Sequence, residues 1–341
     1  MGILGTFKTK KESIDPKSGR IRYAPPFNIA YHKQNLAIVL MLKNYGSSSP
    51  ILPLKKYPQY FSSGDYNVGN PRQLHQSLVQ KNLLVPATPE EILSSLTVTE
   101  LKDILLARSL SGTGRKADLI QRIVNSINID ELDILRKETC YSLSDAGRKF
   151  LDDNYDYILF HKHRVWQLSF EGYCLFRNKI GGNKFYEIAE KLLTEEIRQS
   201  PEEAHIRYSY CTLSEVYGKL EAPEKSLLCL LYAQYIDLNG DYNHPPHKLF
   251  LQGVITKKAF LQSLKKDKFF IEAVVKSISD LQEYFSEAMV KEVYSNRPVE
   301  ARYCNEMEFR SVIYDIFNKK DFPMKKWTSY FMKNFLEYHQ I

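Results

Sequence analysis

The sequence predicts a mainly α-helical chain, in which a small N-terminal domain carrying a helix–loop–helix module precedes an all-α helical bundle. Three observations support this fold class. Apolar residues recur at helical spacing along most of the chain. Helix-capping signals stand at the start of several of these stretches, and glycine or proline separates one from the next. A hydrophobic fraction of 43% over 341 residues is sufficient for two or three domains with cores of their own.

Four regions can be distinguished along the chain. Residues 1–30 contain the runs KTKK and DPKSGRIR, so we expect a basic, irregular arm. Residues 31–160 form an N-terminal region, and residues 96–128 are a separate module within it. From about residue 165 onwards helical patterns follow one another closely, which predicts an all-α C-terminal domain over residues 165–341.

The N-terminal region begins with several helices. The apolar run of residues 31–45 predicts the first of them, which ends near a Gly-Ser-Ser-Ser-Pro loop. Asn70 followed by Pro71 is typical of a helix start, because asparagine caps the helix and proline fits its first position. Thr88 and Pro89 repeat this signature and predict another short helix.

The first helix of the module starts at a capping box. Thr97 and Glu100 form the pattern T-x-x-E, in which the side chain of each residue can bond to the backbone N–H group of the other. Val98, Leu101 and Leu105 follow at helical spacing and form one apolar stripe. These residues predict a short amphipathic helix that packs its stripe against a core.

A tight polar loop connects this helix to a second one. Leu110 lies in the connection, where it can fill the gap between the helices, and residues 111–114 are turn formers. Thr113 is the expected cap of the second helix. The apolar side chains of that helix recur at helical spacing: Leu119, Ile120, Ile123, Val124 and Ile127.

Two cations stand in the first turn of the second helix. The helix dipole disfavours Arg115 and Lys116 at this end, so a purely structural helix would not select them. An anion bound at the turn explains them, because free N–H groups and both cations would converge on it. A DNA phosphate is the obvious candidate. The expected contacts are the loop and the cations around it: Lys102, Arg108, Thr113, Gly114, Arg115, Lys116 and Arg122.

The module has a distinctive pattern of apolar and charged positions in register: Leu96, Val98, Glu100-Leu101-Lys102, Leu105, Leu110, Gly114-x-Lys116, Leu119-Ile120 and Arg122-Ile123. This pattern resembles the SAP family of compact helix–loop–helix units that bind DNA. The resemblance implies a duplex DNA partner held mainly by its phosphates, with limited sequence preference. One departure is Ser109, because the family often has glycine before the loop leucine, and serine costs free energy if that position needs a positive φ. An ordinary helical hairpin with a solvated basic turn is the alternative.

A second resemblance surrounds the module. Residues 74–84 are similar to the last helix and exit of winged-helix domains, and residues 141–151 resemble their wing strand running into the next helix. The SAP-like module would then occupy the place of the wing loop, although a normal wing loop is only a few residues long. This arrangement implies secondary DNA contacts by five residues: Arg72, His75, Gln76, Arg148 and Lys149. The alternative is that these residues form an ordinary solvated surface.

Positive charge is concentrated in the N-terminal part of the chain. Residues 1–95 carry 12 Lys and Arg against 5 Asp and Glu, and residues 96–128 carry 5 against 3. Residues 129–341 carry 30 against 32. The excess of basic over acidic residues that gives the net charge of +7 therefore lies in residues 1–128, which include the module. This distribution suits a polyanionic partner. A soluble basic surface is the alternative.

Membrane and secretory signals are missing from the sequence. The longest apolar run, residues 36–42, is far shorter than the ~20 residues of a membrane helix. The N-terminus is polar and basic and lacks the apolar stretch of a secretory signal. Five widely spaced cysteines without a C-x-x-C motif predict reduced thiols. We therefore expect a cytoplasmic protein with no membrane partner.

The sequence also lacks the common catalytic motifs. It contains no Walker loop, G-x-G-x-x-G, H-E-x-x-H or G-x-S-x-G pattern, so we expect neither an enzyme nor a cofactor. His161 and His163 would share one face of a strand and follow three aspartates, but no downstream ligand has the spacing of a metal site. We expect these side chains to be solvated and no metal to be bound.

The C-terminal domain contains a helical hairpin at residues 204–238 that is similar to tetratricopeptide repeats. No clear second copy follows at the spacing of about 34 residues that such repeats need. We therefore expect a helical bundle that is repeat-like only locally. Trp327, Phe331 and Phe335 are spaced as one buried helix face, an interpretation that we favour over stacking on nucleic acid.

Two hypotheses of function follow. The leading one is a non-catalytic DNA-binding protein, similar to uncharacterised SAP-domain proteins of Gram-positive bacteria and their phages. Its SAP-like module would grip the phosphate backbone, and its C-terminal domain would recruit an unknown protein partner or a second copy of the chain. The rival is a protein-interaction adaptor that acts through the C-terminal helices and keeps the module as a structural hairpin.

Overall fold

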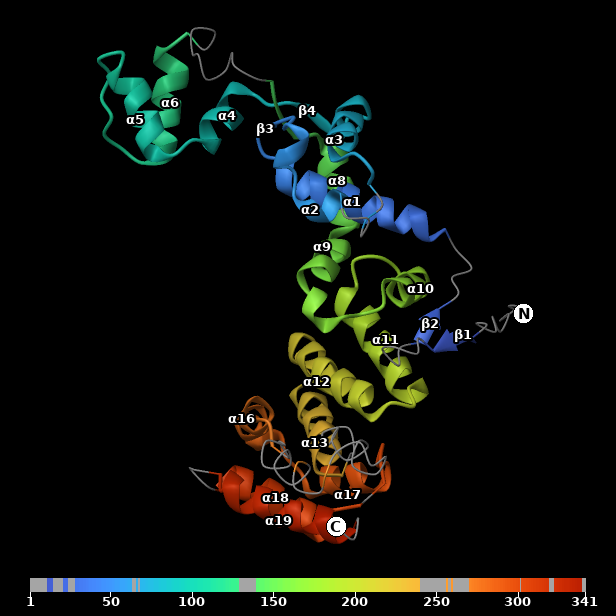
Figure 1. The fold of residues 1–341 in the computed structure, drawn as a ribbon. Helices are drawn as coiled ribbons and strands as arrows, with labels where there is room; N and C mark the ends of the chain where they lie inside the picture. Colours follow the sequence, from blue (N-terminus) through green and yellow to red (C-terminus); the bar gives the residue numbers. More distant parts are fainter. Residues whose placement is uncertain are drawn as a thin grey trace, which may run out of the picture. The chain divides into compact units, whose positions relative to one another are not determined.

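The computed structural model of the chain is mainly α-helical (Figure 1). The chain forms two compact units. One comprises residues 26–165 and 181–185, and the other comprises residues 1–25, 166–180 and 186–341. The structure describes residues 11–14, 21–23, 28–62, 66, 68–128, 139–239, 256, 259, 270–300, 302–318 and 322–338.

The first unit contains a helical frame around a small sheet, and a module of residues 89–128 inserted into that frame. The elements of the frame in chain order are α1 (Ile29–Tyr45), β3 (Ser49–Pro50), η1 (Leu54–Lys56), α2 (Gln59–Ser62), α3 (Pro71–Gln80), β4 (Leu84–Pro86), β5 (Cys140–Leu143), α8 (Asp145–Asp153) and α9 (Tyr155–Lys162). The strand order in the sheet is β3-β5-β4, and both strand pairs are antiparallel.

Strands β4 and β5 are neighbours although the whole module lies between them in the sequence. Leu84 pairs with Leu143, and the Ala87 N–H group donates to the Cys140 carbonyl at 2.9 Å. The chain therefore leaves the sheet after β4 and returns beside its point of departure. The module is an insertion in the connection between two adjacent strands.

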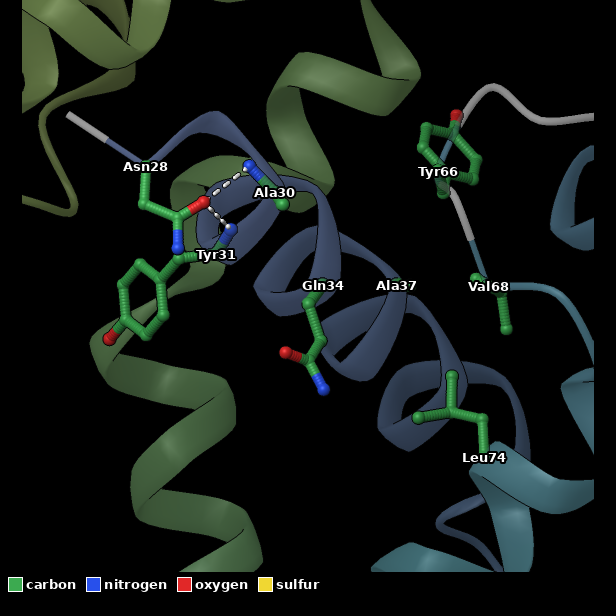
Figure 2. A pocket seen from close by; sticks show the side chains of 8 residues that line it. All are labelled: Asn28, Ala30, Tyr31, Gln34, Ala37, Tyr66, Val68 and Leu74. Carbon is green, nitrogen blue, oxygen red and sulfur yellow. Dashed lines mark hydrogen bonds between the residues drawn. The ribbon is translucent and has the colours of Figure 1, made fainter. Parts of the chain in front are cut away.

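Helix α1 is the main core helix of the frame. The Asn28 side chain caps it and accepts the N–H groups of Ala30 at 3.0 Å and Tyr31 at 3.3 Å, as Figure 2 shows. Residues 36–42, the longest apolar run of the sequence, are all buried. Helices α3, α8 and α9 contact α1, so the frame is organised around this run.

Helix α3 starts at the predicted cap. The Asn70 side chain accepts the N–H groups of Arg72 at 3.0 Å and Gln73 at 3.3 Å, and Pro71 occupies the first helical position. After the helix, Asn82 adopts a positive φ of 53° and turns the chain into β4. Asparagine tolerates this conformation better than most residues, which suits it to the tight exit.

The inserted module consists of three short helices, α4 (Pro89–Ser95), α5 (Val98–Leu106) and α6 (Lys116–Ser126). Capping boxes start the first two, as the sequence predicts for Thr97 and Glu100. Most residues of the predicted apolar stripes meet in one buried core: Leu93, Leu96, Leu101, Leu105, Leu119, Ile123 and Ile127. Val98, predicted to belong to the first stripe, is instead exposed. Leu110 packs against this core from the loop, which confirms its predicted position.

The second unit is helical apart from one strand pair. Its elements are β1 (Lys11–Ile14), β2 (Ile21–Tyr23), α10 (Phe170–Ile180), α11 (Phe185–Gln199), α12 (Glu203–Lys219), α13 (Pro223–Asn239), α16 (Glu272–Asp280), η5 (Gln282–Tyr284), α17 (Glu287–Ser295), α18 (Glu306–Asn318) and α19 (Met324–Tyr338). The short helix η3 (Arg164–Trp166) spans the boundary between the two units in the sequence. The prediction that the N-terminal arm is irregular is wrong for β1 and β2, which pair as antiparallel strands.

The helical core of the second unit lies between α12 and α13 and the later helices. Arg207 on α12 forms two hydrogen bonds to the buried Asp237 carboxylate on α13, at 3.0 and 3.1 Å. Phe331 and Phe335 are fully buried, and Trp327 packs against the same core. The aromatic face of α19 is therefore a core face, as predicted.

The cysteine side chains are mostly inside the fold. Cys174, Cys229 and Cys304 are buried, and Cys140 and Cys211 are partly buried. Burial raises the pKa of the Cys229 and Cys304 thiols, so both stay protonated at neutral pH. Among the helices that the structure describes, none is both long enough and apolar enough to cross a lipid bilayer.

Candidate nucleic-acid interface

The loop between α5 and α6 begins with a residue in the left-handed conformation. Ser109 has a φ of 60°, which is the conformation in which the sequence pattern favours glycine. The next residue, Leu110, donates its N–H group to the Leu105 carbonyl at 2.9 Å and inserts its side chain into the module core. The expected conformational cost at Ser109 is therefore present.

Glycine is required at the other end of the loop. Gly114 has a φ of 128°, and a Cβ atom there would lie 3.2 Å from the Asp118 side chain. The predicted importance of Gly114 thus has a conformational reason. It lets the chain pass close to Asp118 as the second helix starts.

Helix α6 is not capped by Thr113, and this prediction is wrong. The cap position is Arg115, whose backbone N–H group donates to the Asp118 carboxylate at 2.9 Å. The Thr113 hydroxyl instead bonds to the Ser111 hydroxyl at 2.8 Å within the loop. Asp118 stands three residues after Arg115, which is the spacing of the acidic member of a capping box, and this competing signal sets the helix start.

The first turn of α6 leaves backbone donors at its exposed end. The first helical hydrogen bond runs from the Leu119 N–H group to the Arg115 carbonyl, at 3.1 Å. The N–H groups of residues 116–118 precede this bond, and no side chain at the cap position accepts from them. A helix start of this kind can bind an anion, with the Asp118 carboxylate placing one negative charge beside it.

Lys116 makes contacts inside the module. Its ammonium group donates to the Ser94 carbonyl at the end of α4, at 2.7 Å. Hydrogen bonds from Thr97 lower the pKa of the Glu100 carboxyl group, and the nearby Lys116 charge lowers it further. Lys116 therefore joins the end of α4 to the starts of α5 and α6, and its role as a phosphate contact stays a prediction.

Arg122 also has an internal role. Its guanidinium group donates to the carbonyls of Ser111 at 2.5 Å and Thr113 at 2.9 Å, and its side chain is half-buried. Both carbonyls belong to the loop and lie within hydrogen-bond distance of the Arg122 guanidinium group on α6. Arg122 thus supports the shape of the loop, and its role as a direct contact stays a prediction.

The remaining predicted cations of the module are exposed around the loop. Arg115 lies at the end of the loop and Arg108 near its beginning. Lys102 lies beside Gly112, because a Cβ atom added to Gly112 would be 3.4 Å from the Lys102 Cγ atom. The charged groups of all three are on the surface of the module. We call Lys102, Arg108, Arg115 and the first turn of α6 the loop surface.

His75, predicted to be an exposed secondary contact, is fully buried. Its Nδ1 atom is 3.0 Å from the Tyr57 hydroxyl, and its ring lies 5.5 Å from the ring of Tyr45. Burial lowers the pKa of His75 to about 4. His75 is three residues before the buried Leu78, so it lies on the core face of α3, and this spacing is the signal that the prediction missed.

The other secondary contacts divide into two pairs. Arg72 and Gln76 are exposed on α3. Arg148 and Lys149 are exposed on α8 but have acidic neighbours: Glu91 lies 4.0 Å from Arg148, and Asp153 lies 3.1 Å from Lys149. These carboxylates offset both positive charges and make α8 a poorer polyanion surface than α3.

No three His, Cys, Asp or Glu side chains in the part of the chain that the structure describes are grouped to hold a metal ion. His161 bonds to the Tyr66 hydroxyl at 2.5 Å, in contrast to the solvated position predicted for it. A cavity of about 270 Å³ lies between α1, α3 and the preceding loop (Figure 2). None of the described residues that line it is charged: Asn28, Ala30, Tyr31, Gln34, Ala37, Tyr66, Val68 and Leu74.

Comparison with known protein families identifies the module. Residues 92–128 match the SAP domain, while no curated protein and no solved structure matches the chain. The match begins within α4, before the predicted start at residue 96, and Leu93 of that helix is part of the module core. Residues 92–128 are therefore a SAP domain, a module that in general indicates nucleic-acid binding.

Proposed function

We propose that this protein binds duplex DNA without catalysis of its own, and that its SAP domain contacts the phosphate backbone with limited sequence specificity. One observation carries the proposal. The first turn of α6 presents uncapped N–H groups at a surface that Arg115 and Lys102 border. Backbone N–H groups and cations are the groups that bind phosphate oxygens.

The loop surface suits phosphate better than a base edge. Arg115 can donate two parallel hydrogen bonds to one phosphate group. Gly114 adds no side chain that would keep the DNA backbone away. Because three cations and one helix start make few phosphate contacts, binding by the SAP domain alone is modest and weakens as salt rises.

The frame around the SAP domain is proposed to be winged-helix-like. The element order supports this: helix, strand, two helices, strand, insertion and strand, with the last strand in the centre of the sheet. The SAP domain then takes the place of the wing between β4 and β5. Arg72 and Gln76 on α3 remain as secondary DNA contacts.

The helical C-terminal unit is proposed to recruit a protein partner or a second copy of the chain. Residues 129–341 carry no basic excess, which argues against a second large DNA surface there. A role in bacterial or prophage DNA metabolism or regulation, carried out in the cytoplasm, is part of the proposal. It is supported only by the resemblance of the layout to SAP-domain proteins of Gram-positive bacteria and their phages.

An adaptor function is the alternative, and one observation favours it. Lys116 and Arg122 are used inside the module, so the SAP fold can stand as a structural hairpin without any DNA. The adaptor would then act through the C-terminal helices alone.

Retention of the purified protein on immobilised duplex DNA separates the two functions. A DNA-binding protein is retained at low salt, elutes as salt rises and shifts the duplex in a native gel. Arg115→Ala elutes at lower salt, whereas Lys191→Ala, which removes an equal charge from the exposed surface of α11, elutes with the wild type. Elution in the flow-through without a gel shift would leave only the adaptor.

A further inference from the structure

The loop between α5 and α6 carries a hydroxyl group that the proposed DNA contacts do not use. Ser111 lies outside the helices and turns of the module, and its side chain is exposed. Its hydroxyl bonds to the Thr113 hydroxyl at 2.8 Å and accepts the Thr113 N–H group at 3.4 Å. The residue between them, Gly112, has no side chain to cover this oxygen. The Ser111 hydroxyl is therefore open to an enzyme that acts on an exposed loop.

The shape of the loop does not depend on this hydroxyl. The Arg122 guanidinium group on α6 holds the carbonyls of Ser111 and Thr113, and Leu110 anchors the loop in the module core. Both anchors use groups other than the Ser111 hydroxyl. A group attached to the Ser111 oxygen therefore leaves them in place, and the SAP domain stays folded.

Three cations stand near Ser111. Arg108 is three residues before it and Arg115 is four residues after it, and both side chains are exposed. Lys102 on α5 lies beside the residue that follows Ser111. Arginine and lysine form strong charge-assisted hydrogen bonds with a phosphate group. A phosphate on Ser111 would therefore find its partners within the loop surface.

The two neighbouring hydroxyls of the loop are placed less favourably for a phosphate. Ser109 has a φ of 60° and belongs to the turn that ends α5, where the backbone folds back on itself. Thr113 precedes Gly114, at which a Cβ atom would lie 3.2 Å from the Asp118 side chain, and the Asp118 carboxylate repels a phosphate group. Ser111 instead combines exposure with a cation on either side of it in the chain.

We infer that Ser111 is a phosphorylation site, and that its phosphate occupies the loop surface in place of the DNA backbone. In the transfer, the Ser111 oxygen bonds to the γ-phosphorus of a nucleoside triphosphate, the bond from that phosphorus to the bridging oxygen breaks, and the nucleoside diphosphate leaves. The hydroxyl proton passes to the general base of the protein kinase that catalyses the step. This inference rests on the proposed function and adds the regulation of the same surface.

The charge of the phosphate is sufficient to compete with DNA. A phosphoserine carries a charge of about −1.5 to −2 at neutral pH, against the three cations of the loop surface. Because it is attached to the loop, it meets these cations at a far higher effective concentration than a separate duplex does. Phosphorylation of Ser111 therefore releases duplex DNA, and hydrolysis of the phosphate ester restores binding.

Duplex binding by the full chain with phosphoserine inserted at position 111 during translation tests the inference. Anisotropy titrations in about 0.1 M salt are expected to show binding about tenfold weaker than that of the wild type. The slope of log K against log salt should be smaller by roughly one to two phosphate contacts. Ser111→Ala should bind as the wild type does, because the proposed DNA contacts do not include this hydroxyl.

Phosphoserine at position 126 is the matched control. Ser126 is exposed and is the last residue of α6, about 15 Å along the helix from its first turn. This distance exceeds the Debye length of about 10 Å at 0.1 M salt, so the same charge there should change duplex binding much less. Thermal unfolding of each protein checks that it is folded.

The possible outcomes separate this inference from the proposed function. Wild-type affinity with phosphoserine at position 111, or an equal loss with phosphoserine at position 126, overturns the inference while phosphate binding by the SAP domain stands. Absence of duplex binding by the wild type overturns both proposals. Mass spectrometry of the protein isolated from the cells that naturally make it should locate a phosphoryl group on Ser111. An unmodified Ser111 under every growth condition would overturn the assignment of the site.

Discussion

Arg115 and Lys116 are adjacent in the sequence but make different contacts in the structure. The Arg115 side chain is exposed at the edge of the loop surface, whereas the Lys116 ammonium group bonds to the Ser94 carbonyl on α4. The sequence could identify both as cations in the first turn of a helix. It could not separate their roles, because Ser94 becomes a neighbour only when α4 packs onto α6.

We predict that substitution of these two residues has separable effects. Lys116→Ala lowers the free energy of unfolding of the SAP domain by about 1 kcal/mol, since it removes one hydrogen bond at an exposed site. Arg115→Ala leaves that stability nearly unchanged but weakens duplex binding by roughly 1–2 kcal/mol, because it removes a charge-assisted contact. Thermal unfolding and fluorescence anisotropy with a labelled duplex measure the two effects. Equal loss of stability in both variants would contradict the assignment.

Ser109 provides a prediction on stability alone. Its φ of 60° costs a residue with a Cβ atom roughly 1–2 kcal/mol, and glycine avoids this cost. Ser109→Gly is therefore expected to stabilise the protein by about 1 kcal/mol, part of the gain being lost to the greater freedom of glycine in the unfolded chain. In Ser279→Gly the same change falls within the right-handed helix α16 and should be destabilising by about 0.5 kcal/mol. Denaturant unfolding of both variants checks the sign of each effect.

His75 makes the stability of the frame depend on pH. Its pKa is lowered from 6.5 to about 4 in the folded state, so the unfolded chain binds a proton first as the pH falls. The contribution of neutral His75 to the free energy of unfolding is fully present above pH 6.5 and is lost as the pH falls from 6.5 to 4. This loss is at most about 3 kcal/mol.

The variant His75→Phe should lose less stability than the wild type over this pH range, whatever its stability at pH 7.5. Urea unfolding at pH 7.5 and pH 4.5 measures the difference for each protein. An equal loss in both proteins would show that His75 does not carry the pH dependence.

At the scale of the elements, the sequence identifies helices best where a cap and an apolar stripe agree. The starts at Asn70, Thr88 and Thr97 are confirmed because each cap bonds locally, within three residues. Strand β3 has only two residues and exists through its pairing with β5, so no local pattern could reveal it. Helix α6 starts two residues after Thr113, its predicted cap, because the Asp118 carboxylate accepts the Arg115 backbone N–H group.

The connection between β4 and β5 leads to a prediction at this scale. Ala87 and Cys140 are hydrogen-bonded neighbours, so a short turn can replace residues 88–139 without disturbing the sheet. We expect the shortened protein to keep cooperative thermal unfolding of its frame, followed by circular dichroism, and to elute from duplex DNA at much lower salt. If the shortened protein elutes at the same salt concentration as the wild type, the SAP domain does not contribute to duplex binding.

At the scale of the whole molecule, positive charge and the SAP domain occupy the same part of the sequence. The first 128 residues contain all the basic excess, and residues 129–341 have 30 basic against 32 acidic side chains. The SAP pattern could be recognised from the sequence because its residues lie in one continuous segment. The bonds that Lys116 and Arg122 make to backbone carbonyls could not be recognised, because these carbonyls come close to the two cations only in the folded module.

The salt dependence of duplex binding tests the central claim most directly. Anisotropy titrations at a series of salt concentrations give the slope of log K against log salt, in which each phosphate contact contributes about 0.9. We predict that duplex binding by the wild type weakens as salt rises, that the slope is smaller by about 0.9 for Arg115→Ala because one contact is lost, and that Lys191→Ala keeps the wild-type slope. Binding that is absent, that does not depend on salt, or that Arg115→Ala and Lys191→Ala reduce equally would contradict the account.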